Sequence, residues 1–482
     1  MDGRDTINTE TPKASLVVAG ATGFIGQALA PALSQDYHLI GLSRGPREDP
    51  GEYDEFRQAD LFSLKDTENA LAGADFAVYL VHSMLPSARL VQANFRDLDL
   101  VCADNFARAA KRAGVKQIVY LGGIVPDGPL SEHLASRVEV EHVLASTGVS
   151  VTVLRAGLVV GASGSSFQIL LRLVKRLPMM LCPSWTATLT QPVCEKDVIE
   201  TIAHFCRQSS TRHRTFDIAC PQPLSYRELM QKTAAALGLK RLLIGVPLLT
   251  PALSRLWVSL TTGAPKALVR PLIASLRYPM VAHPSRLLDK RAFRTVDEML
   301  ALAVQDAKVE SQKPRAFSSP NTRKSGQRDT VRSVQRMSLP VGRDAHWATE
   351  EYLRWLPKGL KGIIRIDKTD NTDIVFRIFK KGPILLKLSP RLHRSEPSRQ
   401  VLRVTGGLLA KETVRGRLEF RQVLDGQTLI AAIHEFEPAM PWWIYRFTQA
   451  LFHRWVMNRF ARHLGQVGPE KANVAVDSAS LG

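Results

Sequence analysis

Ser15-Leu-Val-Val-Ala-Gly-Ala-Thr-Gly-Phe-Ile-Gly26 joins a short apolar run to a turn that contains three glycines. The apolar run is typical of a buried parallel strand. Gly20 allows a sharp turn, Gly23 leaves the backbone open to a pyrophosphate, and Gly26 lets the next helix pack closely. The start of that helix offers free N–H groups to phosphate. We therefore predict a dinucleotide-binding turn whose contacting residues are Gly20, Thr22, Gly23, Phe24, Ile25 and Gly26.

Apolar runs alternate with helical patterns after this turn. The expected strands are His38–Leu42, Phe76–Val81, Gln117–Leu121 and Ser150–Leu154. The expected helices are Leu90–Ala113 and Leu130–Ser146. Strands separated by helical crossovers predict an α/β fold, a doubly wound parallel Rossmann sheet.

The second predicted strand ends in Ser43 and Arg44, at the position that usually selects the cofactor. An acidic residue there would bind the ribose of NAD, whereas a basic residue favours the 2′-phosphate of NADP(H). We therefore favour NADP(H) over NAD(H), with a solvent-facing arginine as the alternative. Asp60 and Leu61 are expected near the adenine, although Asp60 could equally be a helix N-cap.

His82 and Ser83 follow the next predicted strand of the sheet. The carboxyl ends of parallel strands line the ligand crevice in such folds. We expect the backbone of these two residues to line the cofactor.

Several stretches of the first 300 residues resemble the NmrA-like, atypical branch of the short-chain dehydrogenase/reductases. They are Tyr120-Leu-Gly-Gly-Ile-Val-Pro126, Leu130-Ser-Glu-His-Leu-Ala-Ser-Arg137, Val151-Thr-Val-Leu-Arg-Ala156 and Thr190-Gln-Pro-Val193. This branch includes proteins similar to the NAD(P)H-binding accessory subunit of respiratory complex I. The resemblance covers residues 14–300 and implies an NAD(P)-binding Rossmann domain with a helical, apolar substrate region at 208–300.

Active members of the wider superfamily use a Tyr-x-x-x-Lys pair, in which the tyrosine exchanges the proton. His133 and Arg137 stand at those two positions in this chain. His133 could transfer a proton because its ordinary pKa lies near neutrality, and Arg137 could hold a ribose or a phosphate. They are the candidate catalytic residues. A surface pair four residues apart on a helix is the alternative.

Positive charge is concentrated in the second half of the chain. Residues 301–482 hold 31 Lys and Arg against 17 Asp and Glu, of a total net charge of +19. No nucleic-acid motif accompanies this charge, so we expect a solvated basic face and no nucleic-acid partner. Residues 301–345 are expected to be a basic, flexible linker. Five scattered cysteines predict neither a disulfide framework nor a metal site.

Residues 346–466 are predicted to form an α+β domain. Its expected strands are Gly362–Ile366, Ile374–Phe379, Ile384–Leu388, Gln400–Val404, Arg417–Leu424 and Thr428–Phe436, with a hairpin turn at Asp425-Gly426. A long helix is expected over Trp442–Leu464, with Trp443, Phe447, Trp455 and Phe460. This pattern resembles the START/polyketide-cyclase-like (helix-grip) domains, which implies a cavity for lipid-like ligands. A filled core is the alternative.

Together these features favour an NAD(P)H-binding oxidoreductase that acts on a hydrophobic, quinone- or lipid-like substrate. The missing Tyr and Lys leave two alternatives, a non-catalytic NADP(H)-binding sensor or assembly factor and an NAD(P)-dependent epimerase-type enzyme. The polar N-terminus and the absence of a spanning segment predict a cytoplasmic protein. A peripheral membrane contact through the aromatic C-terminal helix is a further alternative to its packing on the sheet. The oligomeric state stays open.

Overall fold

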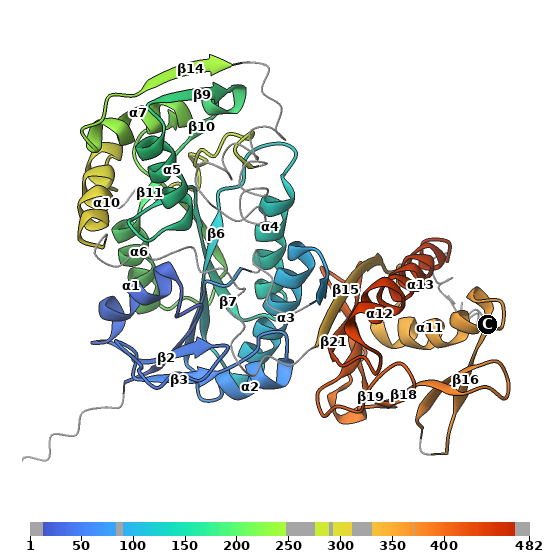
Figure 1. Ribbon diagram of the computed structural model, residues 1–482. Coiled ribbons are helices and arrows are strands. Elements are labelled where there is room, and N and C mark those ends of the chain that lie inside the picture. The colour runs from blue at the N-terminus through green and yellow to red at the C-terminus, as the bar shows by residue number, and fades with distance from the viewer. Residues whose placement is uncertain are drawn as a thin grey trace, which may run out of the picture. The chain divides into compact units, whose positions relative to one another are not determined.

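The computed structural model describes residues 13–82, 90–246, 275–288, 293–310, 330–370 and 372–467. The chain divides into two compact units (Figure 1). The first unit comprises Met1–Leu85 and Asp99–Thr322, and the second comprises Pro86–Leu98 and Arg323–Gly482. A short segment from the N-terminal half therefore belongs to the second unit.

The first unit contains a seven-stranded parallel sheet in the order β12-β7-β6-β4-β1-β2-β3. Its strands are β1 (Ser15–Ala19), β2 (His38–Ser43), β3 (Glu55–Gln58), β4 (Phe76–Tyr79), β6 (Gln117–Gly123), β7 (Ser150–Ala156) and β12 (Arg214–Ile218). The chain order reverses between β1 and β4, which is the point where such sheets bind ligands. The predicted Rossmann-like α/β fold is confirmed.

Helices cover both faces of this sheet (Figure 1). They are α1 (Phe24–Leu33), α2 (Leu64–Leu71), α3 (Phe95–Ala113), α4 (Glu132–Ala145) and α6 (Glu195–Arg207). The helices α5 (Ser165–Arg176), α7 (Tyr226–Ala236) and α10 (Val296–Glu310) pack together in a separate core. Side chains of a strand alternate between the two faces. Val78 of β4 packs in one core with Leu29 of α1 and Ile202 of α6. Its neighbour Tyr79 instead meets Phe106 of α3, with ring centroids 4.9 Å apart.

Two-stranded sheets extend the first unit beyond its main sheet. Their strands are β8 (Val159–Val160), β9 (Met179–Pro183), β10 (Leu189–Thr190), β11 (Val193–Cys194), β13 (Leu224–Ser225) and β14 (Leu242–Val246). The described part of segment 208–300 is not only helical, since it supplies β12 to the main sheet and β14 to a two-stranded one. The polar, buried Asp217 within β12 interrupts the apolar run by which a parallel strand is recognised. Residues 247–274 and 289–292 of the expected substrate region lie outside the described residues.

The expected helix Leu90–Ala113 is wrong at its start. The helix α3 begins at Phe95, and Leu90–Gln92 forms the strand β5. β5 pairs in parallel with β15 (Val331–Ser338) at the edge of the second unit's sheet. A strand of three residues is too short to show a periodic pattern, and its pairing partner lies far along the chain.

The second unit is built on an eight-stranded sheet in the order β16-β17-β18-β19-β20-β21-β15-β5. The remaining strands are β16 (Ile364–Lys368), β17 (Ile374–Ile378), β18 (Ile384–Pro390), β19 (Arg399–Gly406), β20 (Arg417–Val423) and β21 (Thr428–Phe436). All neighbours among them and β15 pair antiparallel. Asp425 and Gly426 take positive φ values between β20 and β21, which confirms the predicted hairpin turn.

One face of this sheet packs against α11 (Ala345–Gly359), α12 (Trp442–Phe447) and α13 (Gln449–Leu464). Tyr352 of α11 and Phe460 of α13 lie 5.1 Å apart, between ring centroids, within this core. The antiparallel sheet with its C-terminal helices is compatible with the expected helix-grip arrangement. The single long helix that we expected is two helices, because the backbone at Thr448 (φ −123°, ψ −85°) leaves the helical region.

The expected linker 301–345 is structured at both ends. α10 extends to Glu310, and Val331–Ser338 is the strand β15. Arg332 and Arg336 in that strand give it the composition of a linker, although Val334 and Met337 are buried. Residues 311–329 lie outside the described residues.

Two further expectations concern chemistry and membranes. All five cysteines are buried and free of disulfides. In the described part of the chain, no helix combines the length and the apolar character needed to cross a bilayer.

Candidate functional site

The glycine turn at the end of β1 has the geometry of a phosphate cradle. Gly20 has φ +93°, and its carbonyl accepts the Gly23 N–H at 2.9 Å. A Cβ at Gly26 would lie 2.3 Å from the Gly20 carbonyl oxygen, so only glycine fits there. Gly23 is the N-cap of α1 and has no side chain to cap the first N–H groups of this helix. These groups fit a dinucleotide pyrophosphate.

The other residues of the predicted turn divide by orientation. Thr22 is exposed, whereas Ile25 is buried in the core and can offer only its backbone to a ligand. Phe24 reaches the loop after β8, because a Cβ at Gly161 would lie 2.6 Å from its ring. Phe24 therefore closes one side of the turn.

Ser43 and Arg44 lie where β2 ends, next to the turn on β1. The Ser43 hydroxyl is directed back to the Gly45 carbonyl. The Arg44 carbonyl accepts from the Gln58 amide at 3.2 Å, while its side chain is exposed. The hydrogen bond fixes the backbone of Arg44 at the end of β2. Its exposed guanidinium is open to a ligand.

Asp60 and Leu61 form the next loop along this edge. The Asp60 carboxylate accepts the Phe62 N–H at 3.1 Å, and the buried Asn105 amide donates to the Leu61 carbonyl at 2.7 Å. The N-cap of α2 is Ser63, whose hydroxyl accepts a backbone N–H. Asp60 therefore does not cap this helix, and its loop is fixed by Asn105.

A cavity of about 300 Å³ opens at the carboxyl ends of β4, β6 and β7. Its wall is mostly apolar and includes Leu121, Leu158, Leu170, Trp185, Tyr226 and Met280. The polar side chains that line it include His82, His133, Arg137 and Ser275. Ser83, predicted beside His82, lies outside the described residues. An apolar cavity with a few convergent polar groups is typical of a small-molecule site.

His133 and Arg137 both line this cavity, one turn apart on α4. Arg137 Nη2 lies 3.0 Å from Asp99 Oδ2, and both side chains are buried. The His133 ring nitrogen Nδ1 lies 3.4 Å from Ser275 Oγ. The alternative reading of these residues as a surface pair is therefore wrong, because the helix turns this face toward the cavity rather than toward solvent.

The environment of His133 keeps its imidazole neutral. Burial and then the positive charge of Arg137, with a smaller contribution from His82, lower the pKa of His133 to about 3. A neutral imidazole still donates one hydrogen bond and accepts another. It is a weak proton donor at neutral pH, unlike a histidine with its ordinary pKa.

The position of the usual catalytic serine is occupied by Gly122 and Gly123. A Cβ at Gly122 would lie 3.1 Å from Glu141 Oε1, which leaves little room for a larger side chain. Arg155 holds that carboxylate in place with an Nη2–Oε2 distance of 2.7 Å. Arg155 is therefore an ion-pair residue below the cavity.

Sequence reasoning missed Asp99, Trp185, Tyr226 and Ser275. These residues come from four separate segments that meet only in the folded chain. Asp99 is one of three acids in α3, and a buried acid needs a cation, but the sequence does not show which of the three is buried. Trp185, Tyr226 and Ser275 carried no signal.

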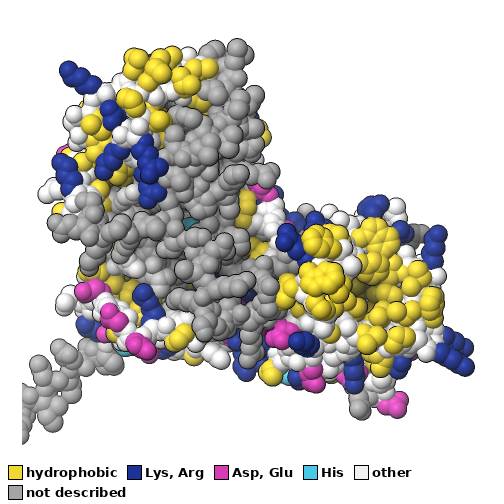
Figure 2. Space-filling model, viewed as in Figure 1, with side chains coloured by type: hydrophobic (Ala, Val, Ile, Leu, Met, Phe, Trp, Pro, Cys, Tyr) yellow, Lys and Arg dark blue, Asp and Glu magenta, His cyan; other side chains and the backbone are white. Residues whose placement is uncertain are grey.

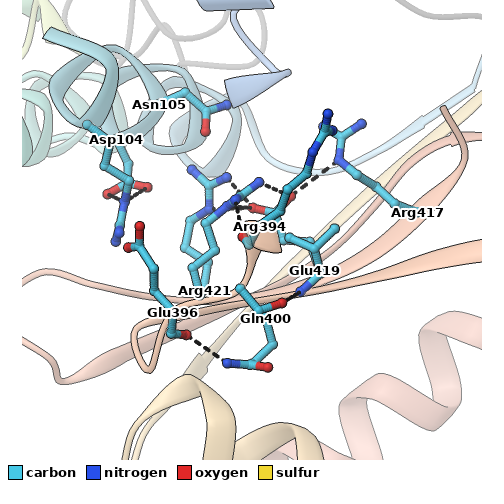
Figure 3. A network of polar contacts seen from close by, with 12 residues as sticks. Asp104, Asn105, Arg394, Glu396, Gln400, Arg417, Glu419 and Arg421 are labelled. Carbon is cyan, nitrogen blue, oxygen red and sulfur yellow. Dashed lines mark hydrogen bonds and ion pairs between the residues drawn. The ribbon is translucent and has the colours of Figure 1, made fainter. Parts of the chain in front are cut away.

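The second unit holds a buried charge cluster on β19 and β20 (Figure 3). Glu419 Oε1 lies 2.7 Å from Arg399 Nε, and Glu419 also pairs with Arg417 and Arg421. Burial would raise the pKa of Glu419, but these three guanidinium groups hold it well below its usual range. The sequence analysis did not predict this cluster.

Comparisons with known proteins find a match in the N-terminal part of the chain. A family model described as NAD(P)H-binding matches residues 20–170. The auxiliary protein GraX of Staphylococcus aureus is 32% identical over 126 residues. That stretch spans 26% of this chain and 41% of GraX, so the match covers less than half of either protein.

Solved structures with low identity align with more than half of the chain. Triphenylmethane reductase from Citrobacter sp. is 18% identical, with a TM-score of 0.48, over 60% of this chain and 99% of its own. A nucleoside-diphosphate-sugar epimerase from Staphylococcus aureus is 16% identical, with a TM-score of 0.48, over 60% of this chain and 99% of its own. The cofactor class rests on the family match and the glycine turn. Residues 20–170 form an NAD(P)H-binding domain.

Proposed function

We propose that the protein is an NADPH-dependent reductase of a hydrophobic, quinone-like acceptor. The apolar cavity of about 300 Å³ beside the NAD(P)H-binding turn carries this proposal. Its size and lining suit a small apolar molecule with one or two polar atoms. Polar side chains that include His82, His133, Arg137 and Ser275 would orient it.

Residues of the first unit would hold the cofactor at three points. The backbone N–H groups after Gly23 would bind the pyrophosphate, and the fixed loop at Asp60 and Leu61 would border the adenine. The exposed Arg44 guanidinium would pair with the 2′-phosphate, which is present in NADPH and absent from NADH. When bound, the cofactor supplies hydride.

The polar residues of the cavity suit an acceptor that can take up hydride without receiving a proton in the same step. Hydride addition to a quinone breaks one C=O π bond and leaves a delocalised hydroquinone anion, which water then protonates. Arg137 provides a fixed positive charge near the developing anion. Neutral His133 donates a hydrogen bond to the acceptor oxygen. Simple ketones and aldehydes would react poorly, because they give a localised alkoxide that requires a strong proton donor.

A non-catalytic NADP(H) sensor is the second candidate. Its support is the buried ion pair between Arg137 and Asp99. Arg137 stands at the position of the usual lysine, and this ion pair gives it a structural role there. In such a protein the cavity would hold a ligand without turnover.

We also propose that the second unit is a helix-grip domain. The strand β15 lies beside the last strand β21, and α13 packs against the same sheet. This order supports the assignment more strongly than the pattern of runs in the sequence.

The test begins with cofactor binding. NADPH and NADH are titrated into the full-length protein while nicotinamide fluorescence is followed, and saturable binding to NADPH is expected. Binding to neither cofactor would refute both candidate functions. A panel of quinones and aldehydes is then assayed with NADPH.

Turnover of quinones and not of aldehydes supports the reductase. Replacing His133 with Ala should lower quinone turnover about tenfold, the cost of one hydrogen bond. Binding of NADPH without oxidation by any acceptor would favour the sensor. Equal turnover in the variant would remove His133 from the mechanism.

A further inference from the structure

The C-terminal helices α12 and α13 expose a series of large apolar side chains. The exposed fractions are 71% for Trp443, 68% for Phe447, 50% for Leu451, 49% for Phe452 and 43% for Trp455. Trp443 and Phe447 lie one turn apart on α12, and Leu451 and Trp455 lie one turn apart on α13. The rings of Phe452 and Trp455 stack with their centroids 5.7 Å apart. We call these five residues the exposed aromatic surface.

Packing of the domain does not account for this surface. The same helices bury Tyr445, Ala450, Val456, Phe460 and Leu464 against the sheet. The core face and the exposed face are thus both apolar, whereas a helix that only packs on a sheet has one apolar face. A contiguous exposed apolar patch marks an interaction site.

The charged residues of α12 and α13 themselves are all basic. No Asp or Glu occurs between Glu437 and Glu470, a stretch that contains Arg446, Arg454, Arg459 and Arg462. The Arg459 guanidinium lies 5.1 Å from the Trp455 ring, and that of Arg446 lies 5.7 Å from the Phe447 ring. Figure 2 shows hydrophobic side chains gathered over the second unit, with Lys, Arg, Asp and Glu side chains at the margins of the gathering.

We propose that the exposed aromatic surface docks on an anionic lipid bilayer. Trp and Phe side chains partition into the interface between headgroups and acyl chains, and arginines beside them pair with lipid phosphates. Each basic residue at such a surface adds attraction to anionic lipid. A protein partner would need acidic groups spaced to match the arginines, whereas a bilayer supplies them at any spacing.

This inference goes beyond the proposed reductase function and does not depend on it. It assigns to the second unit a peripheral contact without insertion of a helix through the bilayer. The candidate lipids share a phosphate in the headgroup. Anionic lipids differ from neutral ones in giving the bilayer a net negative charge.

Sedimentation of the full-length protein with vesicles tests the proposal. Vesicles of phosphatidylcholine alone are compared with vesicles that contain phosphatidylglycerol as well. We expect binding to the anionic vesicles and much weaker binding to the neutral ones. Binding to the anionic vesicles should fall steeply as salt is added.

Variants separate the contribution of the aromatic side chains from that of the arginines. The double substitution Trp443→Ser with Phe447→Ser should weaken vesicle binding about tenfold or more. Two aromatic side chains that would be buried in the bilayer interface are then missing. Arg454→Glu with Arg459→Glu should abolish the preference for anionic vesicles. Leu392→Ser, an exposed apolar residue between β18 and β19, is the matched control and should change nothing. Circular dichroism confirms that each variant is folded.

Three results would overturn the proposal. These are no vesicle binding by the native protein, equal binding to both vesicle types, and full binding by the folded Trp443/Phe447 variant. Size-exclusion chromatography with light scattering tests whether a second copy of the chain covers the surface instead. A native dimer that this variant converts to a monomer, without vesicle binding by either, would assign the surface to a second copy of the chain.

Discussion

Arg137 and Asp99 form a buried ion pair beneath the cavity, with 3.0 Å between Nη2 and Oδ2. Their side chains are 8% and 1% exposed. The hydroxyl of Ser136 donates to the same carboxylate oxygen at 3.0 Å. In a reductase with the usual pair, a lysine at this position would hold the nicotinamide ribose. Here the cation is fixed by a structural partner, so its contribution to any reaction is a stationary charge.

This ion pair should be essential to the stability of the first unit. Replacing Arg137 with Met leaves the Asp99 carboxylate buried without its cation, which costs about 3–5 kcal/mol. Urea denaturation followed by circular dichroism measures the change. Replacing Lys232 with Ala, which breaks an exposed pair with Asp297, should cost no more than about 1 kcal/mol. Similar losses in the two variants would contradict the importance of burial.

The glycine turn should tolerate no side chain at Gly26. A Cβ there would meet the Gly20 carbonyl oxygen at 2.3 Å, so Gly26→Ala must displace the turn or the start of α1. We expect loss of saturable NADPH binding and a lower melting temperature. Gly123→Ala is the control, since its Cβ would meet the nearest atom at an ordinary 3.6 Å. Normal NADPH binding by Gly26→Ala would refute the assignment of the cradle.

The sequence was a good guide where the structure is local. The run from Ser15 to Ala19 and the turn to Gly26 specify a strand, a bend and a helix by themselves, and the structure has all three. The same holds for the hairpin at Asp425-Gly426. Such features depend on backbone conformation and on side-chain alternation within a few residues.

Features that depend on distant partners were not predictable. β5 becomes a strand only because β15 offers it an edge, 241 residues away in the chain. The strand β15 itself has the composition of a linker, because its polar residues outnumber its apolar ones. His133 was expected to be a proton donor with its ordinary pKa, but burial and Arg137 change its proton affinity. No local pattern reports these effects.

Cofactor preference should depend on Arg44. We expect Arg44→Asp to weaken NADPH binding about tenfold or more, because a charge-assisted contact becomes a repulsion, while NADH binding changes little. Fluorescence titration with both cofactors measures the ratio. Arg47→Ala is the matched control, since the Arg47 guanidinium lies 5.0 Å from the Phe56 ring and is engaged there. An unchanged ratio in Arg44→Asp would refute the proposed preference.

The pH dependence of turnover should lack a histidine limb near pH 6.5. The pKa of His133 is lowered to about 3, first by burial and then by Arg137 and His82, so the imidazole is neutral throughout the usual assay range. We expect kcat/KM for a quinone to be flat between about pH 5 and pH 8, the interval in which an ordinary histidine titrates. A limb near pH 6.5 that disappears in His133→Ala would show that His133 titrates during turnover.

The buried Glu419 should make the second unit sensitive to acid. Although burial opposes its charge, Arg399, Arg421 and Arg417 hold its pKa well below the usual range. A carboxyl whose pKa is lowered on folding stabilises the protein above its unfolded pKa of about 4.3, and this contribution is lost as the pH falls toward the folded value.

Glu419→Gln should therefore lower the free energy of unfolding by about 3–5 kcal/mol at pH 7, because three guanidinium groups lose their buried counter-ion. The difference from the native protein should shrink as the pH is lowered below about 4.3. Urea denaturation at a series of pH values measures it. Glu412→Gln, at an exposed carboxylate 3.4 Å from Arg403, serves as the control and should cost no more than about 1 kcal/mol at any pH. A pH-independent loss in Glu419→Gln would show that the side chain stabilises the sheet by packing and not by its charge.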